Sequence, residues 1–406
     1  MAPALRSLAE TQWLAEIAMT SIRQLTAAVI GTGFIGPVHV EGLIRAGVNV
    51  AGILGSTKAK SRRTAEELGL KHGYASLDEL LADEDVDVVH ITSPNRYHFE
   101  QTARTLQAGK HVLCEKPLAM NSRESTELLS IADDSDRVAA VNYNVRYYPL
   151  CLEAADRVRR GEVGEMYHVT GGYVQDWLFH ESDFNWRVLS EDGGELRAVA
   201  DIGTHWLDLV QFITDRKVTA VCADLQTVFA RRQRPIGGVE TFSGNTNAAN
   251  ETVSVDVTTE DSGCVLLKFE GGSRGMMSVS QITAGRKNCL RFEVAGSKQA
   301  IEWCSERPNE IWVGHRDKPN ETLLRDPALI GDRANRHADY PGGHNQGFPD
   351  TFKQLFRDFY GYVAAGDFTA ERSFPTFADG HREVLLCEAI LKSHRGQKWV
   401  EVEGLK

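Results

Sequence analysis

The sequence predicts an α/β protein whose first third folds as a doubly wound parallel sheet and whose remainder is a β-rich α+β part. Short apolar segments alternate with helical patterns up to about residue 143. A glycine-rich turn at residues 31–36 follows the first of these segments. From residue 217 to about 315 the pattern changes to short strands separated by turn signals.

The parallel sheet is expected from five apolar segments. These strands are predicted at residues 27–30, 48–54, 86–92, 110–114 and 137–141. Helical patterns lie between them, around residues 38–46, 58–69, 97–108 and 122–134. Because parallel neighbours need a long crossover connection, usually a helix, this alternation favours a doubly wound sheet.

The second part starts with a helix, a strand and a helix, predicted at residues 149–160, 166–173 and 200–213. Residues 251–258 alternate at period two, and turn signals follow at 261–263 and 271–272. They indicate an antiparallel meander with one face open to solvent or to a partner. Residues 330–348 are loop-rich, and two helices are predicted at 349–364 and 377–393.

Composition narrows the function classes. The chain has 406 residues and a net charge of −11, which argues against the basic face of a nucleic-acid-binding protein. No apolar run reaches the roughly 20 residues of a membrane helix. Thirteen histidines and seven cysteines show no spacing typical of a metal site. The scattered cysteines favour reduced thiols and a cytoplasmic location.

The N-terminus is expected to be an extension of residues 1–24 that lacks the apolar core of a signal peptide. Met19 stands just before the first strand, and residues 1–18 are interpreted as the product of an early start codon. Mass spectrometry of the native N-terminus tests this, because finding Met1 or Ala2 there would rule it out.

The first turn carries a dinucleotide fingerprint. Gly31, Gly33 and Gly36 form G-x-G-x-x-G between a predicted strand and a predicted helix. Such glycines permit a tight turn and let the backbone approach a pyrophosphate at a helix N-terminus. The pattern predicts a Rossmann domain, and a glycine-rich turn without a ligand is the weaker alternative.

The end of the second strand usually selects between NAD and NADP. Residues 52–63 contain no acid to bind a ribose 2′-hydroxyl, but they contain hydroxyls and four bases, Lys58, Lys60, Arg62 and Arg63. This favours NADP, or the use of both dinucleotides. The alternative is that the bases are the solvated face of the next helix.

Two further segments stand where ligands bind in open α/β sheets, at the carboxyl ends of strands. Residues 92–95 (T-S-P-N) follow one strand, and 115–117 (E-K-P) follow the next. A lysine at 116 can point its ammonium at a substrate hydroxyl. Taken alone, each segment can also be an ordinary turn.

A second polar motif comes from a predicted helix. Asp201 and His205 are four residues apart, so an α-helix places them on one face. An acid one turn from a histidine can orient the imidazole and tune its pKa. Taken alone, the pair is equally consistent with a helix cap and a core histidine.

Together these motifs resemble the glucose–fructose oxidoreductase / inositol dehydrogenase / MocA-like (Gfo/Idh/MocA) family over nearly the whole chain from about residue 25. The resemblance is carried by the order and spacing of residues 31–36, 92–95, 109–117 and D-x-G-x-H-x-x-D at 201–208. It implies that Lys116, Asp201 and His205 are the catalytic residues and that a tight turn or cis peptide lies at Lys116–Pro117. The missing acid after the second strand departs from NAD-only members.

The resemblance also implies a Rossmann domain at residues 25–143 and an α+β domain at 144–406. The second domain would hold an open, mainly antiparallel sheet that binds substrate and joins subunits into a dimer or tetramer, with C-terminal helices packed back on the first domain. The predicted cofactor-binding residues are Gly31, Gly33, Phe34, Ile35, Gly36, Ser56, Thr57, Lys58, Ser93, Pro94, Asn95, His98, Glu115, Lys116, Pro117 and Asn144. The predicted substrate-binding residues are Lys116, Asp176, Trp177, Trp186, Arg187, Asp201, His205 and His344.

These features predict an NAD(P)-dependent dehydrogenase that acts on a sugar or polyol hydroxyl. His205 or Lys116 would take the hydroxyl proton, and Asp201 would hold the imidazole. An NAD-dependent glycoside hydrolase of the same fold and a non-catalytic dinucleotide sensor are the competing hypotheses. A membrane, a nucleic acid and a metal ion are not expected as partners.

Overall fold

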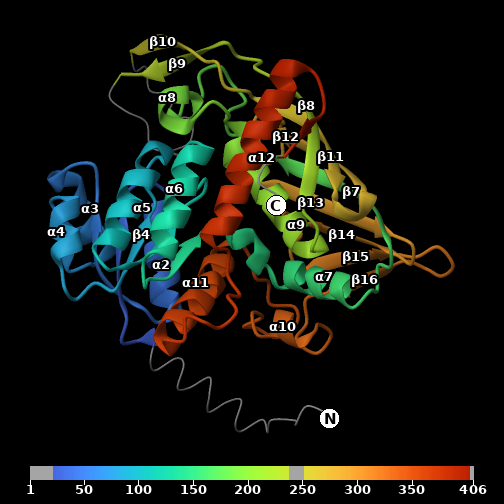
Figure 1. Ribbon diagram of the computed structural model, residues 1–406, viewed down its shortest axis with the longest axis horizontal. Coiled ribbons are helices and arrows are strands. Elements are labelled where there is room, and N and C mark those ends of the chain that lie inside the picture. Colours follow the sequence, from blue (N-terminus) through green and yellow to red (C-terminus); the bar gives the residue numbers. More distant parts are fainter. Residues whose placement is uncertain (1–21, 237–250, 403–406) are drawn as a thin grey trace, which may run out of the picture.

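The structure, a computed structural model, describes residues 22–236 and 251–402. Two β-sheets stand side by side, and the long helix α12 (Phe377–Gly396) runs between them (Figure 1). The proposed extension at residues 1–18 lies outside the described residues. No helix in the described part is long and apolar enough to cross a membrane.

The first sheet confirms the predicted doubly wound fold. Its six parallel strands have the order β3-β2-β1-β4-β5-β6. The strands are β1 (Thr26–Ile30), β2 (Asn49–Leu54), β3 (His72–Tyr74), β4 (Val88–Ile91), β5 (His111–Cys114) and β6 (Ala139–Val141). The helices between them are α2 (Ile35–Ala46), α3 (Lys58–Leu68), α4 (Leu77–Ala82), α5 (His98–Gln107) and α6 (Ser122–Asp133).

The strand order reverses between β1 and β4, and such a switch point leaves a crevice beyond the carboxyl ends of the strands. Strands β4 and β5 are buried along their whole length, which fits their mainly apolar sequence; the histidines His90 and His111 are the exceptions. Strand β3 was not predicted, because a three-residue edge strand with one buried side chain has no apolar run to reveal it.

The second sheet has nine strands in the order β16-β15-β14-β13-β7-β12-β11-β8-β17. They are β7 (Met166–Val174), β8 (Val218–Gln226), β11 (Ser262–Phe269), β12 (Arg274–Ser280), β13 (Cys289–Gly296), β14 (Ala300–Cys304), β15 (Glu310–Gly314), β16 (Glu321–Leu324) and β17 (Val400–Glu401). All pairings are antiparallel except β12 with β7. The meander is confirmed for β13 to β16, whereas the insertion of β7 makes the sheet mixed.

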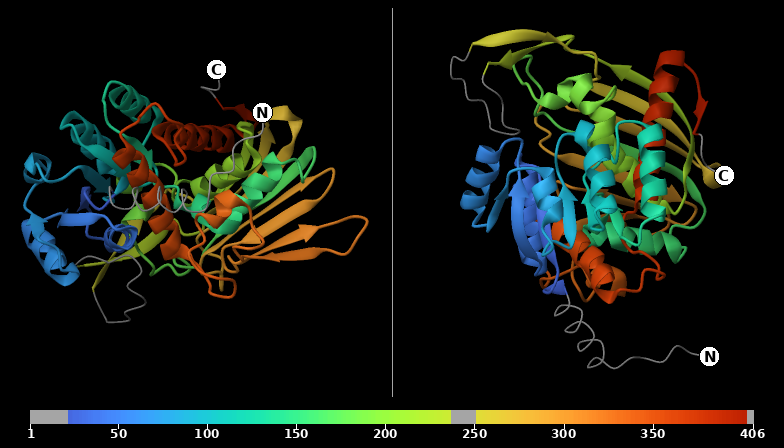
Figure 2. Two further views of the ribbon diagram at one scale, coloured as in Figure 1. Left: turned by 90° about the horizontal axis from the view of Figure 1, so that it is seen from below. Right: turned by 60° about the vertical axis from the view of Figure 1, so that its left-hand side comes forward.

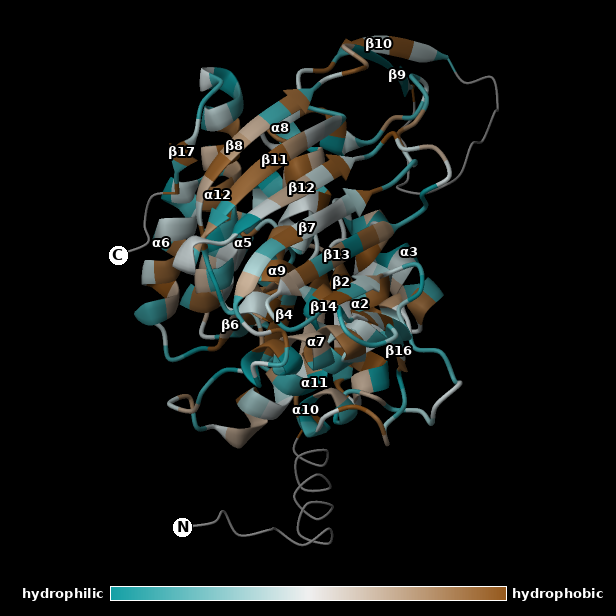
Figure 3. Cartoon of the chain, turned by 90° about the vertical axis from the view of Figure 1, so that its right-hand side faces the viewer, coloured by the Kyte–Doolittle hydropathy of each residue, from teal (hydrophilic) through white to brown (hydrophobic). Residues whose placement is uncertain are grey.

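Helices cover one face of this sheet only. Helices α7 (Pro149–Arg159), α9 (Thr204–Thr214) and α12 pack on it, and the views in Figures 2 and 3 show the strands lying open on the other side. Short helices α8 (Ser190–Gly193) and α10 (Asp332–Asn335) sit in the connecting loops. The predicted open face is therefore present.

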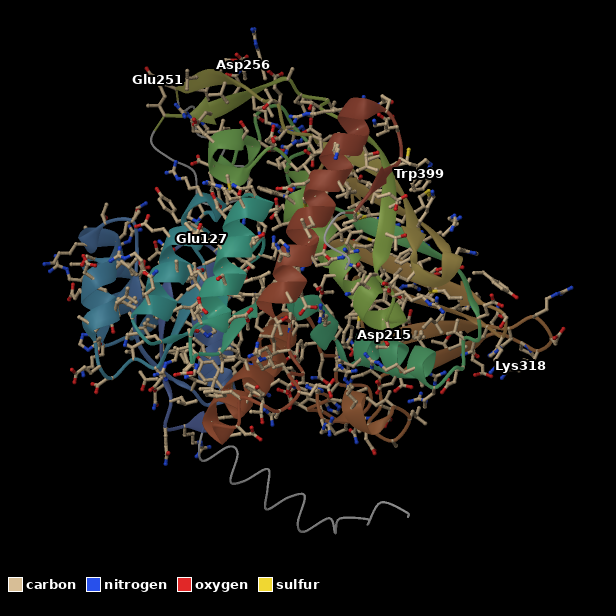
Figure 4. All side chains as sticks on the ribbon, in the orientation of Figure 1. Glu127, Asp215, Glu251, Asp256, Lys318 and Trp399 are labelled. Atoms are coloured by element: carbon tan, nitrogen blue, oxygen red, sulfur yellow. The ribbon has the colours of Figure 1, made fainter. Side chains whose placement is uncertain are left out.

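The alternating segment at 251–258 is not part of this sheet, contrary to the prediction. Strand β10 (Thr252–Asp256) pairs only with β9 (Arg231–Pro235) in a two-stranded ribbon, whose Asp256 is labelled in Figure 4 at the top of the molecule. Even Val253 is 41% exposed. Period-two alternation shows that a segment is extended but does not reveal which sheet receives it.

The two C-terminal helices also pack on the first domain. Helix α11 (Phe348–Ala365) lies against α2, where a side chain at Gly42 would lie 2.9 Å from the ring of Phe356. Helix α12 meets α6, where the hydroxyl of Ser125 lies 2.8 Å from Nδ1 of His381. Packed helices thus join the first domain to the second.

Candidate active site

Three turns meet at the carboxyl edge of the Rossmann sheet. Gly31 follows β1 with φ of 118°, and a Cβ there would lie 2.4 Å from the hydroxyl oxygen of Thr92, which follows β4. A Cβ at Gly36 would lie 2.0 Å from the carbonyl oxygen of Gly31. Only glycine fits these two positions, so the turn brings bare backbone to the start of α2, where a pyrophosphate can approach.

The end of β2 is open to solvent. Ser56, Thr57 and Lys58 are all exposed, and so are the other bases of this segment. The hydroxyl of Thr57 accepts a hydrogen bond of 3.2 Å from the backbone nitrogen of Lys60, so Thr57 caps α3. The bases therefore stand exposed in α3, directly after β2.

The T-S-P-N turn bonds to both domains. Asn95, in the short 3₁₀ helix Asn95–Tyr97, donates from Nδ2 to the carbonyl of Gly193 in α8 at 3.0 Å. His98 is buried, with Nδ1 2.7 Å from the carbonyl oxygen of Pro117 and Nε2 2.9 Å from that of Ser93. In this structure, His98 joins the two cofactor-side turns to each other.

Lys116 crosses from the Rossmann sheet to the second domain. The peptide between Lys116 and Pro117 is cis. The Nζ of Lys116 donates to the backbone oxygen of Asp201 at 2.6 Å and to its Oδ1 at 3.0 Å. The two motifs that lie 85 residues apart in the sequence are therefore in direct contact.

Asp201 is held by three cationic or amide donors. Besides Lys116, the Nε of Arg187 donates to Oδ1 at 3.1 Å, and the Nε2 of Gln281 donates to Oδ2 at 2.9 Å. Burial alone would raise the pKa of the Asp201 carboxyl, but the charges of Lys116 and Arg187 bring this pKa far below its usual range. Asp201 is consequently a permanent anion beside the lysine.

His205 differs from its predicted arrangement. Its Nδ1 is buried without a hydrogen-bond partner, and the oxygens of Asp201 are occupied by the three donors above. Asp201 lies in a π-helical turn, Val199–Gly203, before α9 begins. The i, i+4 argument assumes α-helical rotation, and the wider π turn changes the relative direction of the two side chains. The expectation that Asp201 holds the imidazole was therefore wrong.

The environment of His205 keeps it neutral. Burial, and then the charge of Lys116, lower the pKa of His205 to about 3. The rings of Tyr143 and Tyr173 flank it at centroid distances of 5.8 Å and 6.2 Å. A neutral imidazole beside an ammonium can accept a proton from a substrate hydroxyl.

Of the other predicted substrate-binding residues, Trp186 and Arg187 lie beside Asp201, whereas Asp176 and Trp177 make other contacts. Trp186 carries the guanidinium of Arg187 at 4.4 Å over its ring, beside Asp201. Asp176 pairs with Lys287 at 2.7 Å, while Trp177 packs in a small cluster around Leu178.

Three positions named by the motifs or the predictions have other partners. Asn144 donates to Thr351 at 2.7 Å in a buried position. Asp208 accepts from Arg146 at 2.8 Å. His344 is exposed: its Nδ1 lies 3.3 Å from the carbonyl oxygen of Gly342, and its backbone oxygen accepts a hydrogen bond from Arg325. The structure thus brings Lys116, Asp201, His205, Trp186 and Arg187 together.

Sequence reasoning missed an amide cluster next to this group. The Oδ1 of Asn288 accepts from the hydroxyl of Tyr173 at 2.5 Å and from the Nε2 of Gln175 at 2.7 Å. Gln281 stands one residue beyond β12. The position of Gln281 directly after a strand could have indicated a site residue. This inference would have required knowing that β12 pairs with β7.

One group of metal-ligand-type side chains occurs in the described part, at Cys289, Cys304 and Glu306, whose ligand atoms lie within 4.8 Å of one another. The two sulfurs are 3.8 Å apart, and Glu306 pairs with Arg286 at 2.7 Å. The sequence spacing did not indicate this cluster, because strand pairing brings it together.

Comparison with known families supports the fold and the chemistry class. Residues 25–143 match the oxidoreductase family with an NAD-binding Rossmann fold (GFO_IDH_MocA), and residues 151–302 match the GFO/IDH/MocA C-terminal domain. An uncharacterized oxidoreductase from Synechocystis sp. is 30% identical over 73% of this chain and 76% of its own.

A relative with a named activity covers almost the whole chain. Levoglucosan dehydrogenase from Pseudarthrobacter phenanthrenivorans is 26% identical over 94% of this chain and 99% of its own. The structure of a levoglucosan dehydrogenase in complex with NADH and L-sorbose has a TM-score of 0.84 and 26% identity, and it covers 93% of this chain and 98% of its own.

Proposed function

The chain belongs to the Gfo/Idh/MocA oxidoreductase family, and we propose that it transfers a hydride between a nicotinamide dinucleotide and a ring or chain hydroxyl of a sugar, polyol or related carbohydrate. The observation that carries this proposal is the contact between Lys116 and Asp201. This contact supports the proposal because it joins an ammonium that follows β5 of the first sheet to a buried carboxylate of the second domain, four residues before the neutral His205.

Each residue has a defined role in this proposal. The glycine turn at 31–36 holds the pyrophosphate, and the bound nicotinamide supplies or receives the hydride. Lys116 donates a hydrogen bond to the reacting oxygen and stabilises negative charge on it. His205 accepts the hydroxyl proton during oxidation and returns it during reduction. Asp201 fixes the ammonium of Lys116, with which it is paired at 3.0 Å.

A carbohydrate suits the second-domain side of the site. Trp186 offers a flat ring, Arg187 and Gln281 offer donors, and Gln175 has a buried Oε1 with no hydrogen-bond partner. Aromatic faces and several fixed polar groups are what a polyhydroxylated ring requires. The levoglucosan dehydrogenase relative, whose name describes a sugar substrate, points to the same class.

A panel of sugars and polyols with NAD and with NADP, followed at the nicotinamide absorbance, tests the proposal. We expect turnover with at least one sugar. Release of a free sugar from a glycoside, with no net absorbance change, would instead establish the hydrolase. Tight dinucleotide binding without turnover of any sugar would establish the sensor.

We further propose that the enzyme uses NADP, or both dinucleotides, because four bases and no acid follow β2. We expect Lys58→Glu to weaken NADP binding about tenfold and to leave NAD binding nearly unchanged, since the lost interaction is a charge-assisted one with the 2′-phosphate. Fluorescence titration of both dinucleotides measures this. Lys71→Glu, at another exposed lysine of the same domain, is the matched control. Equal losses for NAD and NADP would contradict the proposal.

A homo-oligomer through the open sheet is proposed for the second domain. Leu266 and Met276 are direct partners across β11 and β12, and they are 48% and 43% exposed. Adjacent apolar side chains on an uncovered face are typical of a subunit interface. We expect Met276→Asp to reduce the sedimentation coefficient to that of a smaller species, while Val253→Asp on the ribbon does not. An unchanged oligomer in Met276→Asp would refute this interface.

A further inference from the structure

A row of buried polar side chains lies behind the E-K-P turn and is not used by the chemistry above. The hydroxyl oxygen of Tyr360 in α11 lies 3.0 Å from Nε2 of His90 in β4. The Nδ1 of His90 is 2.9 Å from Nδ1 of His39 in α2, and the Nε2 of His39 is 3.0 Å from Oε1 of Glu115. Tyr360, His90 and His39 are fully buried, and Glu115 is nearly so. We call these four residues the buried relay.

Glu115 fixes the direction of the hydrogen bond at its own end of the relay. An ionised carboxylate only accepts, so His39 must carry its proton on Nε2. With His39 neutral, its Nδ1 carries a lone pair, to which Nδ1 of His90 donates. His90 in turn has a lone pair on Nε2, which accepts the proton of the Tyr360 hydroxyl. In this arrangement the three hydrogen bonds of the relay run in one direction, from Tyr360 to Glu115.

Aromatic rings surround the two histidines of the relay. The rings of Phe352 and Phe356 pack on His39 at centroid distances of 5.5 Å and 5.1 Å, and Phe356 also meets His90 at 4.8 Å. Burial lowers the pKa of His90 well below its ordinary value, so its ring is neutral. A polar row in so apolar a place is costly unless its hydrogen bonds are complete.

Glu115 remains ionised in this environment. Burial alone would raise the pKa of its carboxyl, but the hydrogen bond from His39 and the charge of Lys116 bring that pKa below its usual range. Asn142 also donates to Oε1 of Glu115. The other carboxylate oxygen, Oε2, accepts the backbone N–H of Lys116 at 3.1 Å. The relay therefore ends on the main chain of the lysine that reaches Asp201.

We propose that Tyr360, His90 and His39 form a one-directional hydrogen-bond relay that makes Glu115 the positioning residue for Lys116. Helix α11, from the C-terminal part of the chain, thereby helps to orient the ammonium of Lys116, which follows a strand of the Rossmann sheet. The arrangement of protons concerns the free protein, and its consequence for catalysis rests on the proposed function. The two parts have separate tests.

The first test reads the tautomers of the free, full-length protein by ¹⁵N NMR of the histidine rings, assigned with His39→Gln and His90→Gln. We expect a proton on Nε2 but not Nδ1 of His39, and on Nδ1 but not Nε2 of His90. An imidazolium or the opposite tautomer at either residue near neutral pH would overturn the relay. This readout needs no substrate, so a failure to find a sugar substrate does not affect it.

The second test separates a polar relay from simple packing. His39→Gln can still donate to Glu115, whereas His39→Leu fills similar space without a donor. We expect kcat to fall about tenfold or more in His39→Leu and less than about threefold in His39→Gln, with dinucleotide Kd unchanged in both. If the leucine variant is as active as the glutamine variant, the position serves packing and the proposal fails.

The far end of the relay has a matched control on its own helix. Tyr360→Phe removes the donor to His90, and we expect kcat to fall about three- to tenfold. Tyr362→Phe removes an exposed hydroxyl that bonds only to the carbonyl of Ala370 at 3.1 Å, and we expect no change. Equal kcat values for the two variants would show that the relay does not extend to α11.

Discussion

Replacing Lys116 by methionine should lower kcat/KM on the enzyme's sugar substrate by about 10²–10⁴. Methionine keeps much of the length of the side chain but removes the charge that faces Asp201 at 3.0 Å and the reacting oxygen. Steady-state kinetics with the substrate found in the panel measures the loss. Dinucleotide binding should persist, because the pyrophosphate turn is separate from Lys116. Turnover at the wild-type rate would remove Lys116 from the catalytic group.

The pH profile of the same variant shows whether Lys116 acts on His205. A base is active when deprotonated, so its activity is lost as the pH falls through its pKa. With the pKa of His205 at about 3, wild-type kcat/KM should show no acid limb from this group between about pH 5 and 8.

Burial lowers the pKa of His205 most and remains in the variant, whereas the lowering by the charge of Lys116 is lost, so the acid limb of the methionine variant should lie at a higher pH than that of the wild type. A variant that only misfolds would lose activity without this shift.

The local parts of the site could be predicted from sequence because each is fixed by its own turn. Gly31 and Gly36 have no room for a Cβ, and Lys116 lies at the carboxyl end of an apolar strand, so composition and spacing reveal both. The contact of Lys116 with Asp201 depends on packing between domains, and only the family resemblance suggested it.

The parts that sequence did not reveal depend on pairing at a distance. Gln281 reaches Asp201 because β12 runs parallel to β7. No sequence motif predicts such a parallel pair inside a mainly antiparallel sheet. The π turn at Val199–Gly203 was not predicted, because α-helical periodicity was assumed where the helix is wider. The buried relay draws on α2, β4, β5 and α11, so its histidines looked in sequence like ordinary core residues.

The largest expected loss of stability comes from Asp261. Its Oδ1 accepts from Arg197, and also from Nη2 of Arg232 at 2.7 Å, and all three side chains are fully buried. Its Oδ2 accepts the backbone N–H groups of Val228 and Phe229 at 2.7 Å and 2.9 Å. One carboxylate therefore neutralises part of two buried guanidinium charges and joins the loop before the ribbon to the segment that leads to Asp201.

Asp261→Asn should lower the free energy of unfolding by about 3–5 kcal/mol, because it removes the carboxylate charge that is paired with two buried guanidinium groups. If Oδ1 of the new asparagine still accepts hydrogen bonds from the two arginines, its Nδ2 faces the backbone N–H groups of Val228 and Phe229, and donor then meets donor. Urea denaturation measures the loss. Asp256→Asn is the control, since Asp256 pairs with Arg231 at 3.1 Å with both side chains more than 70% exposed, and its loss should cost about 0–1 kcal/mol. Adding Arg232→Met to Asp261→Asn should restore part of the stability by removing one unpaired charge. Equal stabilities for the two asparagine variants would show that the buried carboxylate does not hold this part of the second domain together.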